Sequence, residues 1–104
     1  MRVVVSDSVY IKVESFYLDA MERRRLLDEA IVTRKITRLF DALKSLGDFP
    51  YAFPKASVNR EWMRLGYRDF VHEDFHFAYD IVESIDGERL VYVCDAVHSY
   101  LLHE

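Results

Sequence analysis

The chain has few of the residues that shape cross-linked or unstructured proteins. Its 104 residues include one cysteine, two prolines and three glycines. A single cysteine excludes an internal disulfide and a thiolate zinc site. So little glycine and proline, beside 51% hydrophobic residues, is typical of a packed domain and not of a low-complexity chain. We therefore expect one domain over residues 1–104.

The sequence also lacks an apolar run long enough to span a bilayer, and it lacks a charged start followed by an apolar segment. We expect a cytoplasmic protein that has no membrane partner. Its four histidines do not follow a recognised metal-ligand spacing. We expect neither a metal ion nor another cofactor, and the sequence predicts no particular oligomeric state.

Basic residues are in the minority and are unevenly distributed. Fourteen Lys and Arg against eighteen Asp and Glu give a net charge of -4, which argues against binding of naked nucleic acid through phosphates alone. Residues 22–68 hold eleven basic and six acidic side chains, whereas residues 69–104 hold only Arg89 against nine acidic ones. The middle of the chain is therefore the part suited to a polyanion.

The first half of the chain predicts one strand and two helices. Residues 2–5 end in three valines, are too few for a helix and precede a cluster of serine and aspartate. Apolar residues recur at helical spacing from Val9 to Met21, and again from Val32 to Leu46, where Gly47 is a good terminator. The two helices follow each other closely, so we expect an antiparallel hairpin.

The second half predicts a loop and three strands. Residues 47–66 contain both prolines and no sustained periodicity, so they predict a loop with a short helical turn around residues 60–64. Apolar side chains then alternate in three runs, and Asp86-Gly87 between the last two is a strong hairpin signal. The predicted strands are residues 67–72, 75–83 and 89–98.

Alternation along the middle strand places Phe75, Phe77 and Tyr79 on one face, which we expect to meet the helices. The predicted fold class is α+β. It has an N-terminal strand, an antiparallel helical hairpin and a three-stranded antiparallel meander, with the helices packed on one face of the sheet.

Several short motifs lie in these closing strands: Gly66-Tyr67-Arg68-Asp69-Phe70, Phe75-His76-Phe77-Ala78-Tyr79-Asp80-Ile81, Asp86-Gly87-Glu88, Val91-Tyr92-Val93 and Val97-His98-Ser99-Tyr100. They resemble the closing meander of the RelE/ParE superfamily, the toxin halves of bacterial toxin–antitoxin pairs. In that meander an aromatic-basic-apolar-apolar-Tyr strand precedes a hairpin and a last strand that ends in a basic residue. The resemblance covers the whole chain by order of elements and the last third by motif.

The resemblance implies the toxin of a type II toxin–antitoxin pair, kept inactive by a cognate antitoxin protein. The better-known members cleave messenger RNA in the ribosomal decoding site, which implies a metal-independent endoribonuclease whose partner is the ribosome with its mRNA. Another branch poisons DNA gyrase, which implies an inhibitor that binds its target through the helical hairpin. The third alternative is a toxin-fold protein without activity that only binds its antitoxin. The fold alone does not decide between these functions.

The resemblance can be carried over residue by residue. His76 then stands at the position where the ribonucleases have Arg, in the strand before the hairpin. His98 stands at the end of the last strand, where they have a basic residue. Cleavage by attack of the 2′-hydroxyl needs a proton acceptor, a donor or cation at the phosphate, and a proton donor at the leaving oxygen. We expect His76 at the phosphate and His98 or Tyr100 as the acid, with the base unassigned. This mechanism requires both imidazoles to project into one shared hollow.

Arg60, Arg64 and Arg68 are the candidate phosphate contacts on RNA. If Glu73-Asp74 forms a two-residue turn, Asp69 joins His76 and Asp80 on the outer face, where carboxylates repel phosphate. The same turn puts Arg68 at the edge of the apolar face, where it serves packing or an ion pair.

We interpret Trp62 as a lid over the core, the alternative being a stacking partner for a base. Cys94 is predicted to be a small buried hydrophobe in the middle of the last strand.

Overall fold

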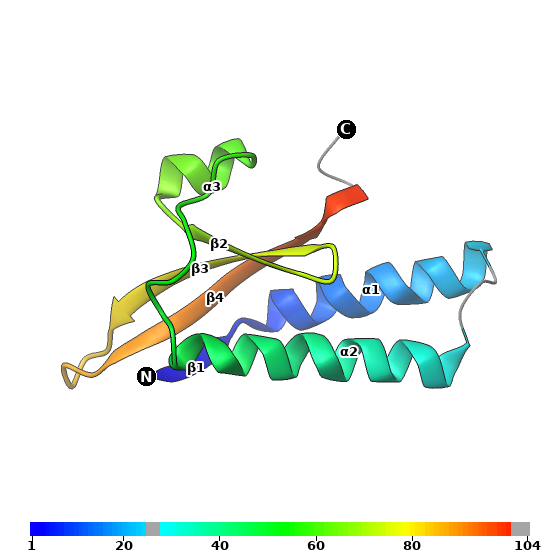
Figure 1. Cartoon of the computed structure of the whole chain (residues 1–104), viewed down its shortest axis with the longest axis horizontal. Coiled ribbons are helices and arrows are strands. Elements are labelled where there is room, and N and C mark those ends of the chain that lie inside the picture. The colour runs from blue at the N-terminus through cyan, green and yellow to red at the C-terminus, as the bar shows by residue number, and fades with distance from the viewer. Residues whose placement is uncertain (25–27, 101–104) are drawn as a thin grey trace.

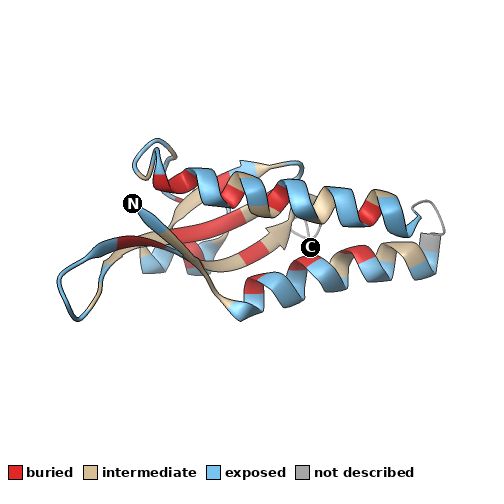
Figure 2. Ribbon diagram, turned by 90° about the horizontal axis from the view of Figure 1, so that it is seen from below, coloured by how far each residue is buried: buried red, intermediate tan, exposed pale blue. Residues whose placement is uncertain are grey.

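The computed structural model describes residues 1–24 and 28–100 (Figure 1). In chain order the elements are β1 (Arg2–Val5), α1 (Asp7–Arg24), α2 (Glu29–Lys44), a 3-10 turn (Ser45–Gly47), α3 (Arg60–Leu65), β2 (Arg68–His72), β3 (Phe75–Glu83) and β4 (Arg89–His98). The helices α1 and α2 lie side by side on one side of a four-stranded sheet (Figures 1 and 2), and the short helix α3 lies on the other side (Figure 1). None of the helices in the described ranges combines the length and the apolar character needed to cross a bilayer.

The sheet has the order β1-β4-β3-β2. β2, β3 and β4 form the expected antiparallel meander, whereas β1 lies parallel to β4, with Val5 opposite Val93. The helical hairpin is thus part of the crossover between two parallel neighbouring strands. The predicted α+β fold with helices on one face is confirmed, and the parallel pairing of β1 with β4 completes it.

The main core lies between the hairpin and the sheet (Figure 2). Phe75, Phe77 and Tyr79 point into it from β3 and are at most 1% exposed. α2 begins where the Asp28 carboxylate accepts the backbone N–H of Ile31 at 2.8 Å, which caps the helix. The core residues from the helices are Val9, Val13, Tyr17, Val32, Leu39 and Leu43. The aromatic face of the meander therefore meets the helices, as the alternation predicts.

The loop before β2 covers part of the opposite face of the sheet. Its helix α3 is one residue longer than the helical turn expected over residues 60–64, with Asn59 as N-cap and Gly66 as a left-handed C-cap. Trp62 of α3 packs with Ala56 on Ala78, and all three are buried. This small second cluster means that the sheet is covered on both faces, although the hairpin lies on only one.

Both turns of the meander contain residues with positive φ. Glu73 and Asp74 form a two-residue turn in which both have positive φ, at 47° and 69°. Gly87, at φ 87°, supplies the left-handed residue of the longer turn between β3 and β4. The pairing of β3 with β4 shifts by one residue between Ala78 and Tyr79, which leaves Cys94 as an unpaired bulge residue in β4.

Two aspartates cap the strand edges that the neighbouring strands leave open. β3 extends beyond Arg68, the first residue of β2, and there the Asp80 carboxylate accepts the backbone N–H of Ile81 at 2.8 Å. β4 extends beyond β1, and there Asp95 accepts the N–H of Ala96 at 2.9 Å. A charged side chain on an open edge opposes pairing with another strand.

Replacing Asp80 by alanine is expected to cause self-association that rises with protein concentration, because the Ile81 N–H then offers an uncapped edge. Sedimentation velocity over a concentration series measures this effect. Asp41→Ala on the exposed side of α2 is the control and is expected to sediment like the parent protein. A concentration series for Asp80→Ala that superimposes on that of the parent would contradict the protective role of this carboxylate.

Candidate functional site

His76 and His98 lie on opposite faces of the sheet. His98 pairs with Phe75, which faces the helices, whereas His76 pairs with Val97. The cause is the bulge at Cys94, because a one-residue shift turns every later side chain of the strand to the other face. With unbroken pairing the two histidines would share a face. The expectation that both imidazoles enter one hollow is therefore wrong.

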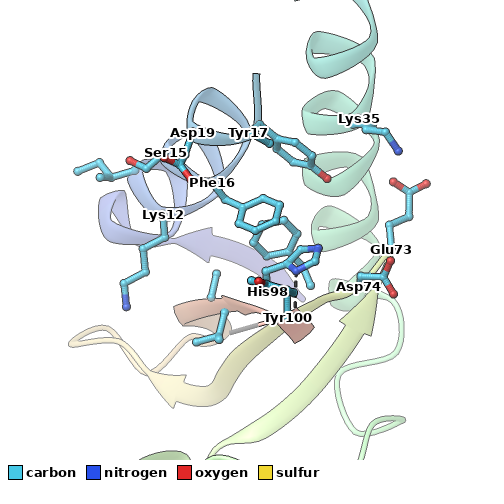
Figure 3. A pocket seen from close by; sticks show the side chains of 15 residues that line it. Lys12, Ser15, Phe16, Tyr17, Asp19, Lys35, Glu73, Asp74, His98 and Tyr100 are labelled. Carbon is cyan, nitrogen blue, oxygen red and sulfur yellow. Dashed lines mark hydrogen bonds between the residues drawn. The ribbon is translucent and has the colours of Figure 1, made fainter. Parts of the chain in front are cut away.

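His98 lies in a cleft of about 770 Å³ between α1, the start of β3 and the end of β4 (Figure 3). This volume is within the range of small-molecule and peptide side-chain pockets. The cleft lining consists of Ile11, Lys12, Ser15, Phe16, Tyr17, Asp19, Ala20, Lys35, Glu73, Asp74, Phe75, Ala96, Val97, His98 and Tyr100.

Aromatic contacts hold the ring of His98. It stacks on Phe16 with 4.0 Å between ring centres and meets Phe75 edge to face at 5.1 Å. The backbone N–H of Tyr100 donates to its Nδ1 at 3.1 Å. An accepting Nδ1 places the proton of the neutral imidazole on Nε2, so the ring is oriented as a donor there. His98 and Tyr100 therefore share this cleft as the resemblance implies, but without His76.

Charged side chains of both signs ring the apolar floor of the cleft (Figure 3). Lys12 and Lys35 come from the two helices, and Glu73 and Asp74 come from the β2–β3 turn. Burial raises the pKa of Tyr17, and the nearby carboxylates of Glu73 and Asp74 raise it further. An apolar floor with a mixed charged rim is the anatomy of a protein-binding surface.

His76 forms a close pair with Asp69 on the other face of the sheet. Its Nδ1 lies 2.9 and 3.1 Å from the two carboxylate oxygens, and the side chains are 15% and 11% exposed. A carboxylate at Nδ1 fixes the N–H there and leaves Nε2 as the acceptor in the neutral ring. The predicted neighbourhood of Asp69 and His76 is confirmed, and it orients His76 as a proton acceptor.

Of the three candidate phosphate contacts, Arg68 lies apart from the other two. Arg60 and Arg64 lie on α3, and Arg64 bonds Glu61 at 3.1 Å, which lowers the pKa of that carboxyl. Arg68 donates to the carbonyl oxygen of Phe53 at 2.6 Å and shares the face of Phe70, away from His76. The two-residue turn thus gives Arg68 the packing position predicted for it.

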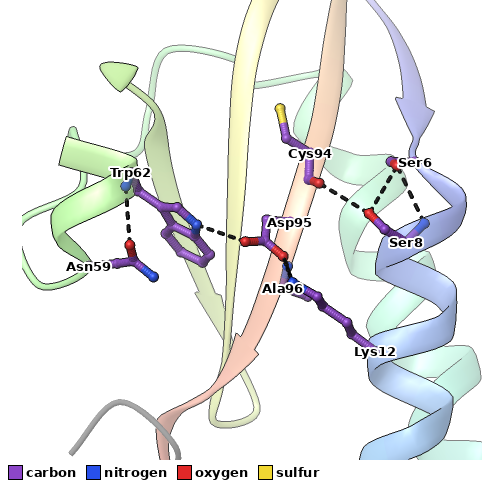
Figure 4. Close-up of polar contacts among 8 residues, drawn as sticks. All are labelled: Ser6, Ser8, Lys12, Asn59, Trp62, Cys94, Asp95 and Ala96. Atoms are coloured by element: carbon purple, nitrogen blue, oxygen red, sulfur yellow. Dashed lines mark hydrogen bonds and ion pairs between the residues drawn. The ribbon is translucent and has the colours of Figure 1, made fainter. Parts of the chain in front are cut away.

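Asp95 is a polar junction that the sequence analysis does not single out (Figure 4). One carboxylate oxygen accepts the indole N–H of Trp62 at 3.0 Å, and the other accepts from the ammonium group of Lys12. Asp95 therefore ties α3 on one side of the sheet to α1 on the other. The signal that could have found it is a lone carboxylate within an apolar strand. Trp62 is 2% exposed, so its interpretation as a lid is confirmed.

Cys94 is half-buried at the bulge and not fully buried as expected. Burial raises the pKa of its thiol to about 11, and the carboxylates of Asp80 and Asp95 contribute to that rise. Among residues 1–24 and 28–100, no group of three or more His, Cys, Asp or Glu side chains is placed to hold a metal ion.

Alkylation of Cys94 by iodoacetamide at pH 8 is expected to be roughly two orders of magnitude slower than that of an ordinary thiol, because the thiolate is the reacting species. The rate should rise about tenfold per pH unit up to pH 10. Mass spectrometry of timed samples measures it, with Ser57→Cys in a Cys94→Ala background as the exposed control. Equal rates for the two thiols would contradict the raised pKa.

Neither the scan against protein-family models nor the search of curated proteins found a match to this chain.

Proposed function

We propose that this chain is the toxin of a type II toxin–antitoxin pair, similar to RelE and ParE, and that it acts by binding a protein target without cutting RNA. The observation that carries the proposal is the arrangement of its elements. β1 leads into the helical hairpin, β4 lies parallel to β1, and the meander completes the sheet, an order consistent with a RelE-like fold. The closing motifs of the sequence support the same family.

Two observations favour protein binding over RNA cleavage. The nitrogen groups that cleavage would combine, His76 and His98, lie on opposite faces. The face of His76 carries Asp69 and Asp95, both opposite Ala78 in the strand pairing, and their charges repel phosphate. The cleft at His98, by contrast, offers aromatic rings and charges of both signs to a protein segment.

Regulated expression in a bacterial host tests the proposal. We expect growth arrest with intact mRNA, and we expect co-expression of the cognate antitoxin, sought as a short protein encoded by a neighbouring reading frame, to relieve it. The first target assay is supercoiling by DNA gyrase, which we expect the protein to inhibit. Ile11→Glu, at an exposed residue of the cleft lip, is expected to abolish the arrest. Leu18→Glu, on the same helix outside the cleft and similarly exposed, is the matched control. Expression without any arrest would overturn the toxin proposal.

The His76–Asp69 pair favours a second candidate, ribosome-dependent mRNA cleavage with His76 as general base. Its carboxylate-oriented imidazole has the arrangement of a catalytic base. In that case mRNA mapping shows codon-positioned cuts that His76→Ala removes and Ile11→Glu retains. Arrest that survives His76→Ala without such cuts would exclude this candidate and support the protein-binding toxin.

A further inference from the structure

A second hollow lies at the other end of the sheet from the His98 cleft. It has a volume of about 300 Å³ and adjoins the part of β3 that extends beyond β2. Its polar lining comes from the loop before α3, the start of β2, the end of β3 and the start of β4, and it shares no residue with the cleft. The side chains that matter to its chemistry are Tyr51, Lys55, Arg68, Asp80, Glu83 and Arg89.

Neutral acceptors hold the three cations of this hollow in place. Lys55 donates to the carbonyl oxygen of Gly66 at 2.8 Å, and Arg68 donates to that of Phe53 at 2.6 Å. Arg89 lies 3.5 Å from the Tyr51 hydroxyl. Across the described ranges, none of these cations lies within 4.0 Å of a carboxylate oxygen. The hydrogen bonds to neutral acceptors therefore position the three cationic side chains and leave their positive charges unpaired by a carboxylate.

Two carboxylates also line the hollow, but they do not cancel this charge. The carboxylate of Asp80 accepts a hydrogen bond from the backbone N–H of Ile81. Glu83 is an exposed residue at the end of β3, opposite Arg89 in the strand pairing. Three cations against two carboxylates leave the hollow electropositive on a protein that is acidic overall.

We propose that this hollow binds the phosphate group of a nucleotide, a function separate from that of the cleft. A guanidinium presents donors in a fork that matches phosphate oxygens, and Arg68 and Arg89 retain further donors beyond the bonds described. The ring of Tyr51, with the Arg68 guanidinium 5.5 Å from its centre, is 56% exposed and offers a surface on which a base can stack. The carboxylate of Glu83 is an acceptor for hydroxyl or amino groups of the same ligand.

NMR titration of the ¹⁵N-labelled chain with three probes tests this site: inorganic phosphate, a nucleoside 5′-monophosphate and the same nucleoside without phosphate. We expect both phosphate-containing probes to shift the amides of residues 51–55, 80–83 and 89 in a saturable way, and the nucleoside to shift none of them. Tighter binding of the monophosphate than of phosphate identifies a nucleotide site. Equal affinities would overturn the nucleotide assignment and leave a site for free phosphate.

Arg89→Gln is expected to weaken binding of the phosphate-containing probes about tenfold, the effect of losing one charge-assisted bond. Arg2→Gln is the matched control, since Arg2 is an exposed arginine on the neighbouring part of the sheet and outside the hollow. Tyr51→Leu should weaken binding of the monophosphate more than that of inorganic phosphate, because only the monophosphate also loses the stacking surface. Equal weakening by Arg2→Gln and Arg89→Gln, or the absence of saturable shifts, would overturn the proposal.

Discussion

Replacing Trp62 by alanine is expected to lower the free energy of unfolding by about 3–5 kcal/mol. The side chain is 2% exposed and is the largest member of the small cluster that covers Ala78 and contacts Tyr67 and Val97. Its removal leaves a cavity that the six-residue helix α3 has few other contacts to close. It also removes the indole donor of Asp95. A loss of this size is a large share of the total stability of a small domain.

Urea unfolding followed by far-ultraviolet circular dichroism measures this loss, because the variant contains no tryptophan for a fluorescence signal. Met63→Ala is the control, since Met63 is the next residue of α3 and is 50% exposed. It should change the free energy by no more than about 0.5 kcal/mol. A Trp62→Ala midpoint close to that of Met63→Ala would show that α3 contributes little to the fold.

Much of the fold is predictable from local pattern. Alternation along Phe75–Glu83 assigns the buried face of β3, and the spacing from Val32 to Leu43 assigns that of α2. The turn at Glu73 and Asp74 fixes the register of β2 against β3, which correctly joins Asp69 to His76. These features depend on residues close together in the chain, so the sequence contains the information that decides them.

The candidate site is less predictable because it depends on the bulge at Cys94. Nothing in Val93-Cys94-Asp95 marks an extra residue, since the usual glycine of one bulge type is absent. Yet that residue decides whether His98 faces the helices or the outer side of the sheet. The pairing of β1 with β4 joins the two ends of the chain and also has no local signal.

Replacing Asp95 by alanine is expected to lower the free energy of unfolding by about 2–3 kcal/mol. The change leaves the buried indole N–H of Trp62 and the backbone N–H of Ala96 without an acceptor. The ion pair with Lys12, which is 48% exposed, adds little because solvent screens it. Urea unfolding measures the loss, with Asp19→Ala as the control. Asp19 also pairs with a cation, Arg23, but at an exposed position, so its removal should cost at most about 1 kcal/mol.

A double-mutant cycle isolates the link between Asp95 and the lid. Trp62→Phe keeps an aromatic ring in the cluster but removes the indole N–H and part of the buried ring system. The packing loss is common to both arms of the cycle, so Asp95→Ala should cost about 1 kcal/mol less in that background than in the parent. If the two losses instead add, the contact between Trp62 and Asp95 carries no stability of its own, and α3 is held by packing alone. A coupling of the expected size means that the hydrogen bond from the indole N–H to Asp95 helps to hold α3 on the sheet.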